Sequence, residues 1–318
     1  MGEKHTLLFL KILKKGGIYL ILLLLVGVSS IISPDFYHFK NIFNILEQSS
    51  FKGIVSLGQT LVILGGGIDL SVASVMSCVN VLLAAITLGR NEVTLQAILI
   101  CLVFGSLIGL INGVIIVKRG VPAFIVTLGM MIILQGLRLI YTKGAPWGYI
   151  PSIIRFLGVG RIMGSFPISF IIFLIIAVLS YIVLKKMIFG RQLYAVGVNE
   201  RAAHSTGVNT DLIRIITYVV CGLLAAVSGI ILSGYINTAD NWAAKGYELD
   251  SIAAVVVGGT MLEGGTGGVS GTVAGIILIA LVTNLMVFAG LGIEMQLIGK
   301  SLIIIASISL YRRIYLKQ

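Results

Sequence analysis

Charged residues are scarce in this sequence. Only 11% of its 318 residues are Asp, Glu, Lys or Arg, whereas 58% are hydrophobic. Soluble domains carry roughly 25% charged residues. A chain with so few charges cannot cover itself with a water-facing surface, and its mean hydropathy of +1.08 agrees with burial in lipid. The composition therefore excludes an ordinary soluble domain and predicts a protein of the bilayer.

Residues that perform bond chemistry are also few. The sequence has three His and three Cys, and Cys78, Cys101 and Cys221 all lie within apolar runs without metal-ligand spacing. Gly299-Lys300-Ser301 resembles the end of a phosphate-binding loop, but Glu294 stands where that motif requires glycine. No nucleophile–base pattern accompanies it, which argues against a membrane enzyme. We predict no catalytic residue, no metal site and no cofactor bound by this chain.

Long apolar runs dominate the rest of the sequence. A spanning helix needs about 20 mostly apolar residues. The expected spans are residues 16–33, 46–64, 71–88, 94–117, 121–142, 167–185, 211–235, 248–260, 271–290 and 294–311. The first is too long for a signal-peptide core and lacks a clear cleavage site, so it is expected to remain as a helix. We predict an all-α, polytopic helical bundle of about ten transmembrane helices, forming one domain over residues 1–318.

The net charge of +11 would suggest a nucleic-acid partner in a soluble protein. Here Lys and Arg lie mainly between apolar runs, where they determine membrane orientation instead. With the N-terminus inside, inner segments carry 13 Lys and Arg residues and outer loops carry 6. We therefore predict that both termini are cytoplasmic, with an outer loop at about 143–166, an inner segment at about 187–210 and no nucleic-acid partner.

Two glycine-rich breaks interrupt the apolar pattern. One lies within Leu64–Ser71 and the other within Gly258–Gly268, and each contains one carboxylate and precedes an apolar run. Glycine-interrupted segments in the two halves of a chain indicate a transport pathway. The candidate gating glycines are Gly65, Gly66, Gly67, Gly258, Gly259, Gly264 and Gly265.

Polar residues inside the spans are the candidates for a solute pathway. Asp69 is expected to accept N–H groups at the start of the next helix, to contact solute, or both. Amides in lipid need partners, so they are expected to face the bundle and to bond between helices, and their lack of charge suits a neutral polyol. Lys300 and Arg138 are expected to extend toward an interface. The candidate pathway residues are Gln59, Asp69, Asn80, Asn112, Thr127, Gln135 and Asn284.

The inner segment is expected to contain a short surface helix. Glu200–Ser205 has helix-forming residues, and Gly207 is expected to end the helix in the left-handed conformation. Ala202 and Ala203 have little reason to lie in an aqueous segment unless something covers them. We therefore expect this helix to dock into a groove on a soluble partner.

Several stretches, in chain order, resemble the ribose-type permeases of bacterial ABC importers. They are Gly66–Ser71, Asn112–Gly113, Pro122–Met130, Asn199–Asn209 and Gly246–Thr260. The resemblance implies a homo- or heterodimer of permease subunits in the bacterial cytoplasmic membrane, with cytoplasmic ATPase subunits that use ATP and an extracytoplasmic solute-binding protein. It also implies that the inner segment couples to the ATPase through Asn199, Glu200, Arg201, Ala202, Ala203 and Gly207.

The expected function is import of ribose or a similar monosaccharide by alternating access, with the glycine breaks as hinges or gates. Two alternatives stay open, because branched-chain amino acid permeases are related and a stand-alone ion-coupled transporter has a similar composition. The sequence lacks the chain of buried carboxylates typical of ion-coupled transport, and Asp69 is its best single candidate.

Overall fold

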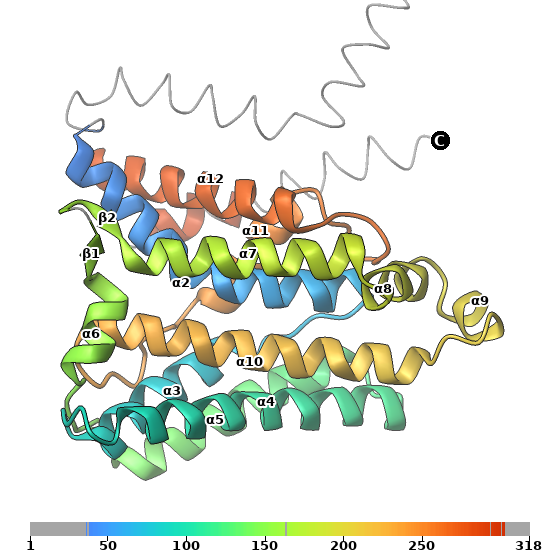
Figure 1. The fold of residues 1–318 in the computed structure, drawn as a ribbon, viewed down its shortest axis with the longest axis horizontal. Helices are drawn as coiled ribbons and strands as arrows, with labels where there is room; N and C mark the ends of the chain where they lie inside the picture. Colours follow the sequence, from blue (N-terminus) through green and yellow to red (C-terminus); the bar gives the residue numbers. More distant parts are fainter. Residues whose placement is uncertain (1–35, 37, 163, 293, 300, 303–318) are drawn as a thin grey trace, which may run out of the picture.

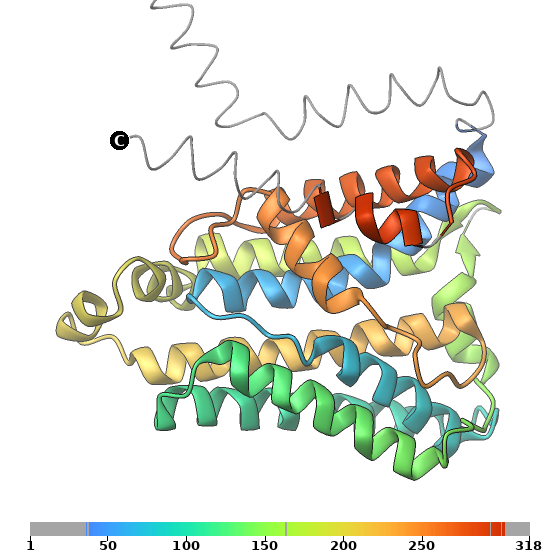
Figure 2. The ribbon, with the colours of Figure 1, turned by 180° about the vertical axis from the view of Figure 1, so that it is seen from behind.

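The bundle is elongated, with its helices running approximately along one direction (Figures 1 and 2). A computed structural model describes residues 36, 38–162, 164–292, 294–299 and 301–302. Helices α8 (Ile188–Val198) and α9 (Glu200–Ser205) project at one end, called the α9 end below. Helix α6 (Ser152–Val159) lies at the opposite end, called the α6 end.

Each apolar segment expected between residues 46 and 290 coincides with a helix. These helices are α2 (Phe39–Leu64), α3 (Val72–Thr87), α4 (Thr94–Arg119), α5 (Ala123–Thr142), α7 (Ile168–Lys186), α10 (Thr210–Ile236), α11 (Tyr247–Val257) and α12 (Val269–Phe288). Five of them, α4, α5, α7, α10 and α12, are long and apolar enough to cross a membrane. The fold is therefore that of a polytopic helical membrane protein. The expected first span lies outside the described residues, as does most of the last, of which 294–299 and 301–302 are helical.

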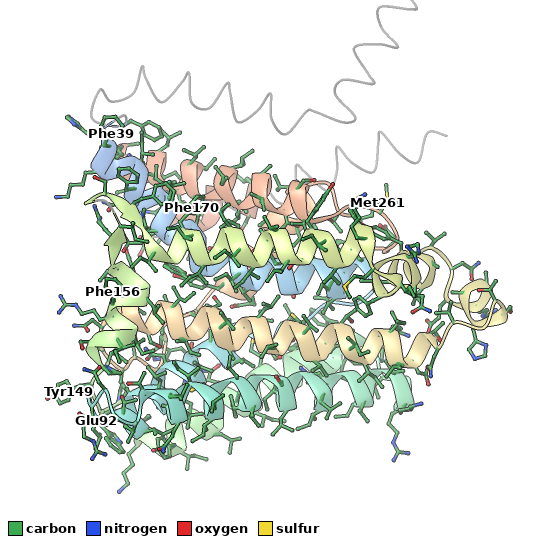
Figure 3. The ribbon with its side chains drawn as sticks, in the orientation of Figure 1. Phe39, Glu92, Tyr149, Phe156, Phe170 and Met261 are labelled. Carbon is green, nitrogen blue, oxygen red and sulfur yellow. The ribbon has the colours of Figure 1, made fainter. Side chains whose placement is uncertain are left out.

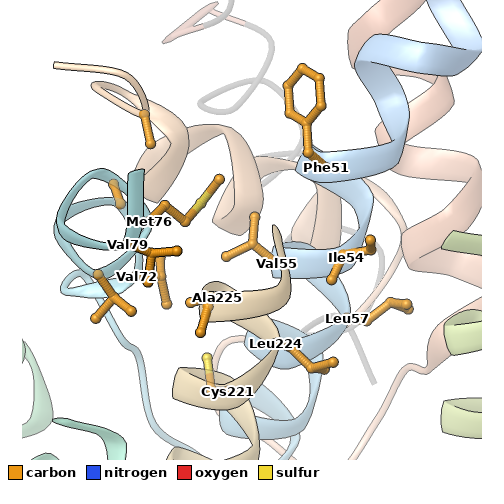
Figure 4. Packing of buried hydrophobic residues seen from close by; sticks show 14 of the residues in the cluster. Phe51, Ile54, Val55, Leu57, Val72, Met76, Val79, Cys221, Leu224 and Ala225 are labelled. Atoms are coloured by element: carbon orange, nitrogen blue, oxygen red, sulfur yellow. The ribbon is translucent and has the colours of Figure 1, made fainter. Parts of the chain in front are cut away.

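Helix α2 lies in the centre of the bundle, and its second half is almost fully buried. It contacts α10, α12, α11 and α7, and α10 in turn contacts α3. Figure 4 shows Val55 of α2 facing Met76 of α3 and Ala225 of α10, and each of these side chains is at most 1% exposed. The core of the protein is thus formed by α2, α3 and α10.

Close packing of α4 against α10 depends on glycine. A Cβ atom on Gly105 would overlap the carbonyl oxygen of Gly222, and one on Gly109 would overlap the carbonyl oxygen of Tyr218. Small residues at such spacing let two helix backbones approach closely in a membrane. Gly105, Gly109 and Gly113 recur every four residues, and all three lie against α10.

Two of the eight helices at the expected spans are too short to cross the bilayer. At 1.5 Å per residue, the 11 residues of α11 extend only about 17 Å, and the 16 residues of α3 about 24 Å. Residues 65–71 and 237–246, which precede them, are largely non-helical. Figure 2 shows that the segment before α3 starts near the α9 end and enters the bundle before the helix begins. The short segment expected at 248–260 is confirmed as a short helix.

The two long connections contain more structure than the sequence predicted. Within 187–210, α9 matches the expected surface helix Glu200–Ser205, but α8 was not expected. The connection at 143–166 contains α6, strand β1 (Arg161–Ile162) and the start of β2 (Phe166–Pro167), which pair antiparallel. Figure 3 places Glu92, Tyr149 and Phe156 together at the α6 end, and Met261 towards the α9 end.

Candidate functional site

A buried polar cluster lies at the start of α3. Asp69 is only 1% exposed, and its Oδ1 accepts hydrogen bonds from the Ser71 backbone N–H at 2.9 Å and the Ser71 hydroxyl at 2.6 Å. Asn112 of α4 donates to the Ser71 hydroxyl at 2.9 Å. The Asp69 carboxylate therefore organises the turn into α3, as the sequence predicted. Both donors belong to Ser71, the N-cap residue of α3, and not to a residue of the first helical turn.

Two further predicted residues hold the backbone of the same turn. With its amide oxygen facing the Asp69 N–H, Gln59 of α2 makes a reciprocal pair with the Asp69 backbone, at 3.2 Å for each bond. The Thr127 hydroxyl of α5 is 3.5 Å from the Ile68 carbonyl oxygen and donates to the Ala123 carbonyl at 2.8 Å. Helices α2, α4 and α5 therefore all contribute predicted residues to one cluster around Asp69.

The cluster retains an unused acceptor. Asn112 is fully buried, and its Oδ1 has no hydrogen-bond donor among the described residues. A buried acceptor without a donor costs roughly 1–3 kcal/mol. A water molecule or a solute hydroxyl at this position would satisfy it.

The other predicted pathway residues lie away from this cluster. The amide of Asn80 donates to the Ser233 hydroxyl and the Thr238 carbonyl, each at 3.1 Å, and accepts from the Asp240 N–H at 2.7 Å. Asn284 exchanges hydrogen bonds with Asn41 at 2.9 and 3.0 Å. These bonds confirm the expectation that Asn80 and Asn284 connect separate parts of the chain. Gln135 lies on α5, nearer the α6 end than Thr127.

The prediction that Arg138 extends toward an interface is wrong. Its side chain is 5% exposed and points into the protein, where Nη1 lies 3.4 Å from the Ser74 carbonyl oxygen. Sequence reasoning also missed Lys52 of α2, which pairs with Asp250 of α11 at 3.2 Å. A charged residue within an apolar span indicates a functional or paired site. Arg138 and Lys52 both lie within such spans, so the sequence contained this signal for each of them. Lys300 lies outside the described residues.

The two glycine-rich breaks meet at the α9 end. The Gly265 N–H donates to the Leu64 carbonyl oxygen at 3.0 Å, which joins the second break to the end of α2. A Cβ atom on Gly264 would lie 3.0 Å from the Gly66 nitrogen and 3.0 Å from the Gly197 carbonyl oxygen. Since Gly264 has a φ of +94° as well, neither its conformation nor its surroundings accommodate a side chain. We call these close contacts between residues 64–66, 197–198 and 264–265 the glycine junction.

The predicted gating glycines divide into two groups. Gly65, Gly66, Gly264 and Gly265 lie at the glycine junction, and Gly67 lies beside it, against the Tyr218 hydroxyl. Gly258 instead packs on Gly271 at the start of α12, and Gly259 follows it in the turn after α11.

Helix α8 contacts both breaks directly. Leu193 lies against Gly65, and the Tyr194 hydroxyl donates to the Gly267 carbonyl oxygen at 2.8 Å. At the C-terminal end of α8, a Cβ atom on Gly197 would overlap the Leu64 carbonyl oxygen and the Gly265 nitrogen. Only Asn199 separates α8 from α9. Helix α8 therefore links α9 to both glycine breaks.

The short helix α9 is capped and anchored at its start. Asn199 accepts a hydrogen bond from the Ala202 N–H at 3.0 Å, as an N-cap residue does. Glu200 forms two hydrogen bonds with Arg214 of α10, at 2.9 and 3.0 Å. Gly207 has a φ of +87°, which confirms the left-handed conformation expected after the helix. Arg201 is exposed on the same helix.

The two alanines of α9 differ in their surroundings. Ala203 is 5% exposed, and its carbonyl oxygen accepts hydrogen bonds from the Val208 N–H at 3.2 Å and the Thr206 hydroxyl at 2.8 Å. The burial of Ala203 is therefore provided by this chain and does not require a partner, contrary to the sequence argument. Ala202 is exposed. Of the two, Ala202 is the alanine available to a docking partner.

The fold and the site together define a polytopic helical membrane protein with interrupted helices around a buried polar interior, which is the architecture of a transporter. A family described as the permease component of the branched-chain amino acid transport system matches residues 41–308. The chain belongs to this permease family.

Several curated proteins are similar to the chain over nearly its whole length. The ribose import permease protein RbsC of Escherichia coli strain K12 is 39% identical over 291 residues, which cover 90% of each chain. RbsC of Bacillus subtilis strain 168 is 36% identical over 313 residues, covering 98% of this chain and 97% of the relative. The galactose/methyl galactoside import permease protein MglC of Escherichia coli strain K12 is 34% identical over 320 residues, covering 95% of each. No solved structure matches the chain significantly.

Proposed function

We propose that this chain is the transmembrane permease subunit of an ATP-driven importer that moves ribose or a similar monosaccharide across the bacterial cytoplasmic membrane. The proposal is supported by the names of the relatives, which are import permeases for ribose and for galactose or methyl galactoside. It is also supported by the neutral amide and hydroxyl groups around Asp69, which suit a polyol better than an ion. The permease domain would extend over residues 1–318.

The proposed complex has three kinds of partner. A pair of cytoplasmic ATPase subunits would bind at the α9 end and use the ATP, so that this chain binds no cofactor itself. An extracytoplasmic solute-binding protein would bind at the α6 end. A second permease subunit, identical or paralogous, and membrane lipid would cover the exposed apolar faces of helices such as α5 and α7. In the most apolar stretch of 18 residues, only 17% of α5 and 28% of α7 is buried.

One observation carries the proposed mechanism: α8 contacts both glycine breaks and continues directly into α9. The ATPase pair would move α9 when it closes on ATP. Because α8 lies against both breaks, the same movement would shift the ends of α2 and the segment before α12 together. A transporter needs such a two-state element because solute must be exposed to one side of the membrane at a time.

Transport by the reconstituted complex tests this function. Purified permease, with its cognate ATPase and binding protein, is placed in liposomes, and uptake of radiolabelled D-ribose, D-galactose and L-leucine is measured. We expect uptake of ribose or galactose that requires both ATP and the binding protein. Uptake of leucine alone would favour the amino acid alternative. Uphill uptake by the permease alone, driven by an ion gradient, would establish the secondary-transporter alternative.

Replacing Ala202 by Glu is expected to uncouple the ATPase from transport. The side chain is exposed on α9, and a buried negative charge in a protein interface is costly unless it is paired. We expect ATP hydrolysis stimulated by the binding protein to fall at least fivefold, with the permease still present in the membrane. Ala202→Ser adds only a hydroxyl and serves as the matched control. Normal stimulation in Ala202→Glu would refute the assignment of α9 as the coupling helix.

A further inference from the structure

A cavity of about 320 Å³ lies between α3, α5 and the segment that leads into α11. Ala73, Ser74 and Ser77 line it from α3, and Met131, Gln135 and Arg138 line it from α5. Trp242, Lys245 and Glu248 complete its wall. Its size is at the lower end of the range of ligand pockets, roughly 300–1,000 Å³, and suits a single sugar ring.

Within the described part of the chain, Arg138 brings a buried donor without a partner to this cavity. The residue is 5% exposed, and its Nε has no hydrogen-bond partner among the described residues. The contacts of Nη1 are long, at 3.4 Å to the Ser74 carbonyl oxygen and 3.9 Å to the Cys78 sulfur. No carboxylate of the described residues lies within ion-pair distance of the guanidinium. A buried guanidinium is costly unless its N–H groups are hydrogen-bonded. The Arg138 guanidinium can therefore donate to an acceptor on a bound solute.

The Trp242 indole forms an aromatic wall of the same cavity. The side chain is 45% exposed, with the Arg138 Cζ 5.8 Å from its ring centroid and the Lys245 Nζ 5.6 Å from it. Two cations thus flank one aromatic ring. Among the described residues, Glu248 is the one carboxylate that lines the cavity, and its Oε2 already accepts from the Gly246 N–H at 3.1 Å.

Serines of α3 connect the cavity wall to neighbouring segments. The Ser74 hydroxyl donates to the Met131 carbonyl oxygen of α5 at 2.9 Å. The Ser77 hydroxyl accepts from the Ala244 N–H at 3.2 Å and so fixes the segment that carries Trp242. Three residues before Ser74 on the same chain is Ser71, which bonds to Asp69. The lining residue Ala73 therefore lies two residues after Ser71, the N-cap residue bonded to Asp69.

We propose that this cavity holds the monosaccharide during transit, with Arg138 as its principal hydrogen-bond donor and Trp242 as the surface on which the sugar ring packs. Hydroxyl and ring oxygens would accept from the guanidinium, and the Gln135 amide and the Glu248 carboxylate would accept from sugar hydroxyls. Aromatic rings offer an apolar face that fits the C–H face of a sugar. The inference rests on the proposed sugar transport and identifies where in the chain the sugar is held.

The sequence provides a direct reporter of binding, because Trp147 and Trp242 are its only tryptophans. Trp147 lies on the connection before α6 and stacks on Tyr141, with ring centroids 6.3 Å apart. In a Trp147→Phe permease, all tryptophan fluorescence comes from Trp242. We expect D-ribose or D-galactose, titrated to millimolar concentration into the full-length purified chain, to change this fluorescence saturably. The reciprocal Trp242→Phe permease is expected to show no change.

Substitution of Arg138 then tests the proposed donor. We expect Arg138→Gln in the Trp147→Phe chain to weaken the saturable response at least tenfold, and in the reconstituted complex to lower sugar uptake at least tenfold. Arg155→Gln removes an exposed arginine of α6 and is the matched control. A sugar response that is absent, or that is unchanged by Arg138→Gln, would overturn the proposal.

The same experiments separate this inference from the proposed function. If the complex imports sugar normally with Arg138→Gln, or if Trp242 does not respond, the transit site is wrong while the transport function stands. If Trp242 responds to L-leucine and to neither sugar, both the sugar assignment and this site for a sugar are refuted.

Discussion

Replacing Gly197 by Ala is expected to abolish ATP-driven uptake while leaving the permease in the membrane. Gly197 lies at the glycine junction, where an added Cβ atom would overlap both the Leu64 carbonyl oxygen and the Gly265 nitrogen. All the atoms in its way belong to backbone, so no side-chain rotation can relieve the overlap. The extra methyl would have to separate α8 from the two breaks, which removes the contact through which α9 acts on them.

Uptake and assembly must be measured together to interpret this variant. We expect no ATP-dependent sugar uptake in proteoliposomes, with binding of the ATPase subunits retained, since α9 and its anchor to Arg214 are unaltered. Gly129→Ala is the matched control, because Gly129 lies within α5 and an added Cβ there meets no atom within 4 Å. Wild-type uptake by Gly197→Ala would show that the glycine junction has no part in coupling.

The Gly197→Ala permease should still fold, because the glycine junction is separate from the buried core. The buried core of α2, α3 and α10 lies along the bundle, whereas the glycine junction lies at its α9 end. A small separation at that end leaves the contacts of Val55, Met76 and Ala225 in place. The expected phenotype is therefore a loss of transport that exceeds any loss of thermal stability.

The helices were largely predictable from the sequence because the membrane imposes a simple local rule. Every backbone group must be paired within the lipid, so apolar runs form helices and glycine clusters mark their interruptions. The short α11 and the breaks beside Asp69 and Glu263 follow from this rule. Helix α8 was missed because Ile188–Val198 contains Gly190, Arg191 and Gly197, which lower both its apolar character and its helix propensity.

The arrangement of the candidate site was less predictable, because it depends on contacts between distant segments. Nothing local to Gly66, Gly197 or Gly264 indicates that these three glycines meet. Similarly, Gln135 and Arg138 are three residues apart on α5 and can share a face, but the wall provided by Trp242 comes from a segment about 100 residues later. The sequence therefore predicted where helices form, but it did not predict which helices and segments lie next to one another.

Replacing Asp69 by Ala is expected to lower sugar uptake at least tenfold. The substitution removes the acceptor of two buried hydrogen bonds, from the Ser71 N–H and the Ser71 hydroxyl. Buried donors left without partners cost roughly 1–3 kcal/mol each, so the turn into α3 would rearrange. Because Asn112 and Gln59 also bond to this turn, the rearrangement would reach α4 and α2. Normal uptake with a normal amount of folded permease would exclude a role for Asp69.

Asp69→Asn separates the geometry of this carboxylate from its charge. The asparagine side chain keeps an oxygen at the position that accepts both bonds from Ser71, and it removes the negative charge. Since uncharged groups surround the carboxylate, we expect Asp69→Asn to retain at least half of the wild-type uptake. Glu92→Ala, which removes an exposed carboxylate at the α6 end, controls for a change in net charge. If Asp69→Asn is as defective as Asp69→Ala, the charge itself is required, and the ion-coupled alternative gains its strongest support.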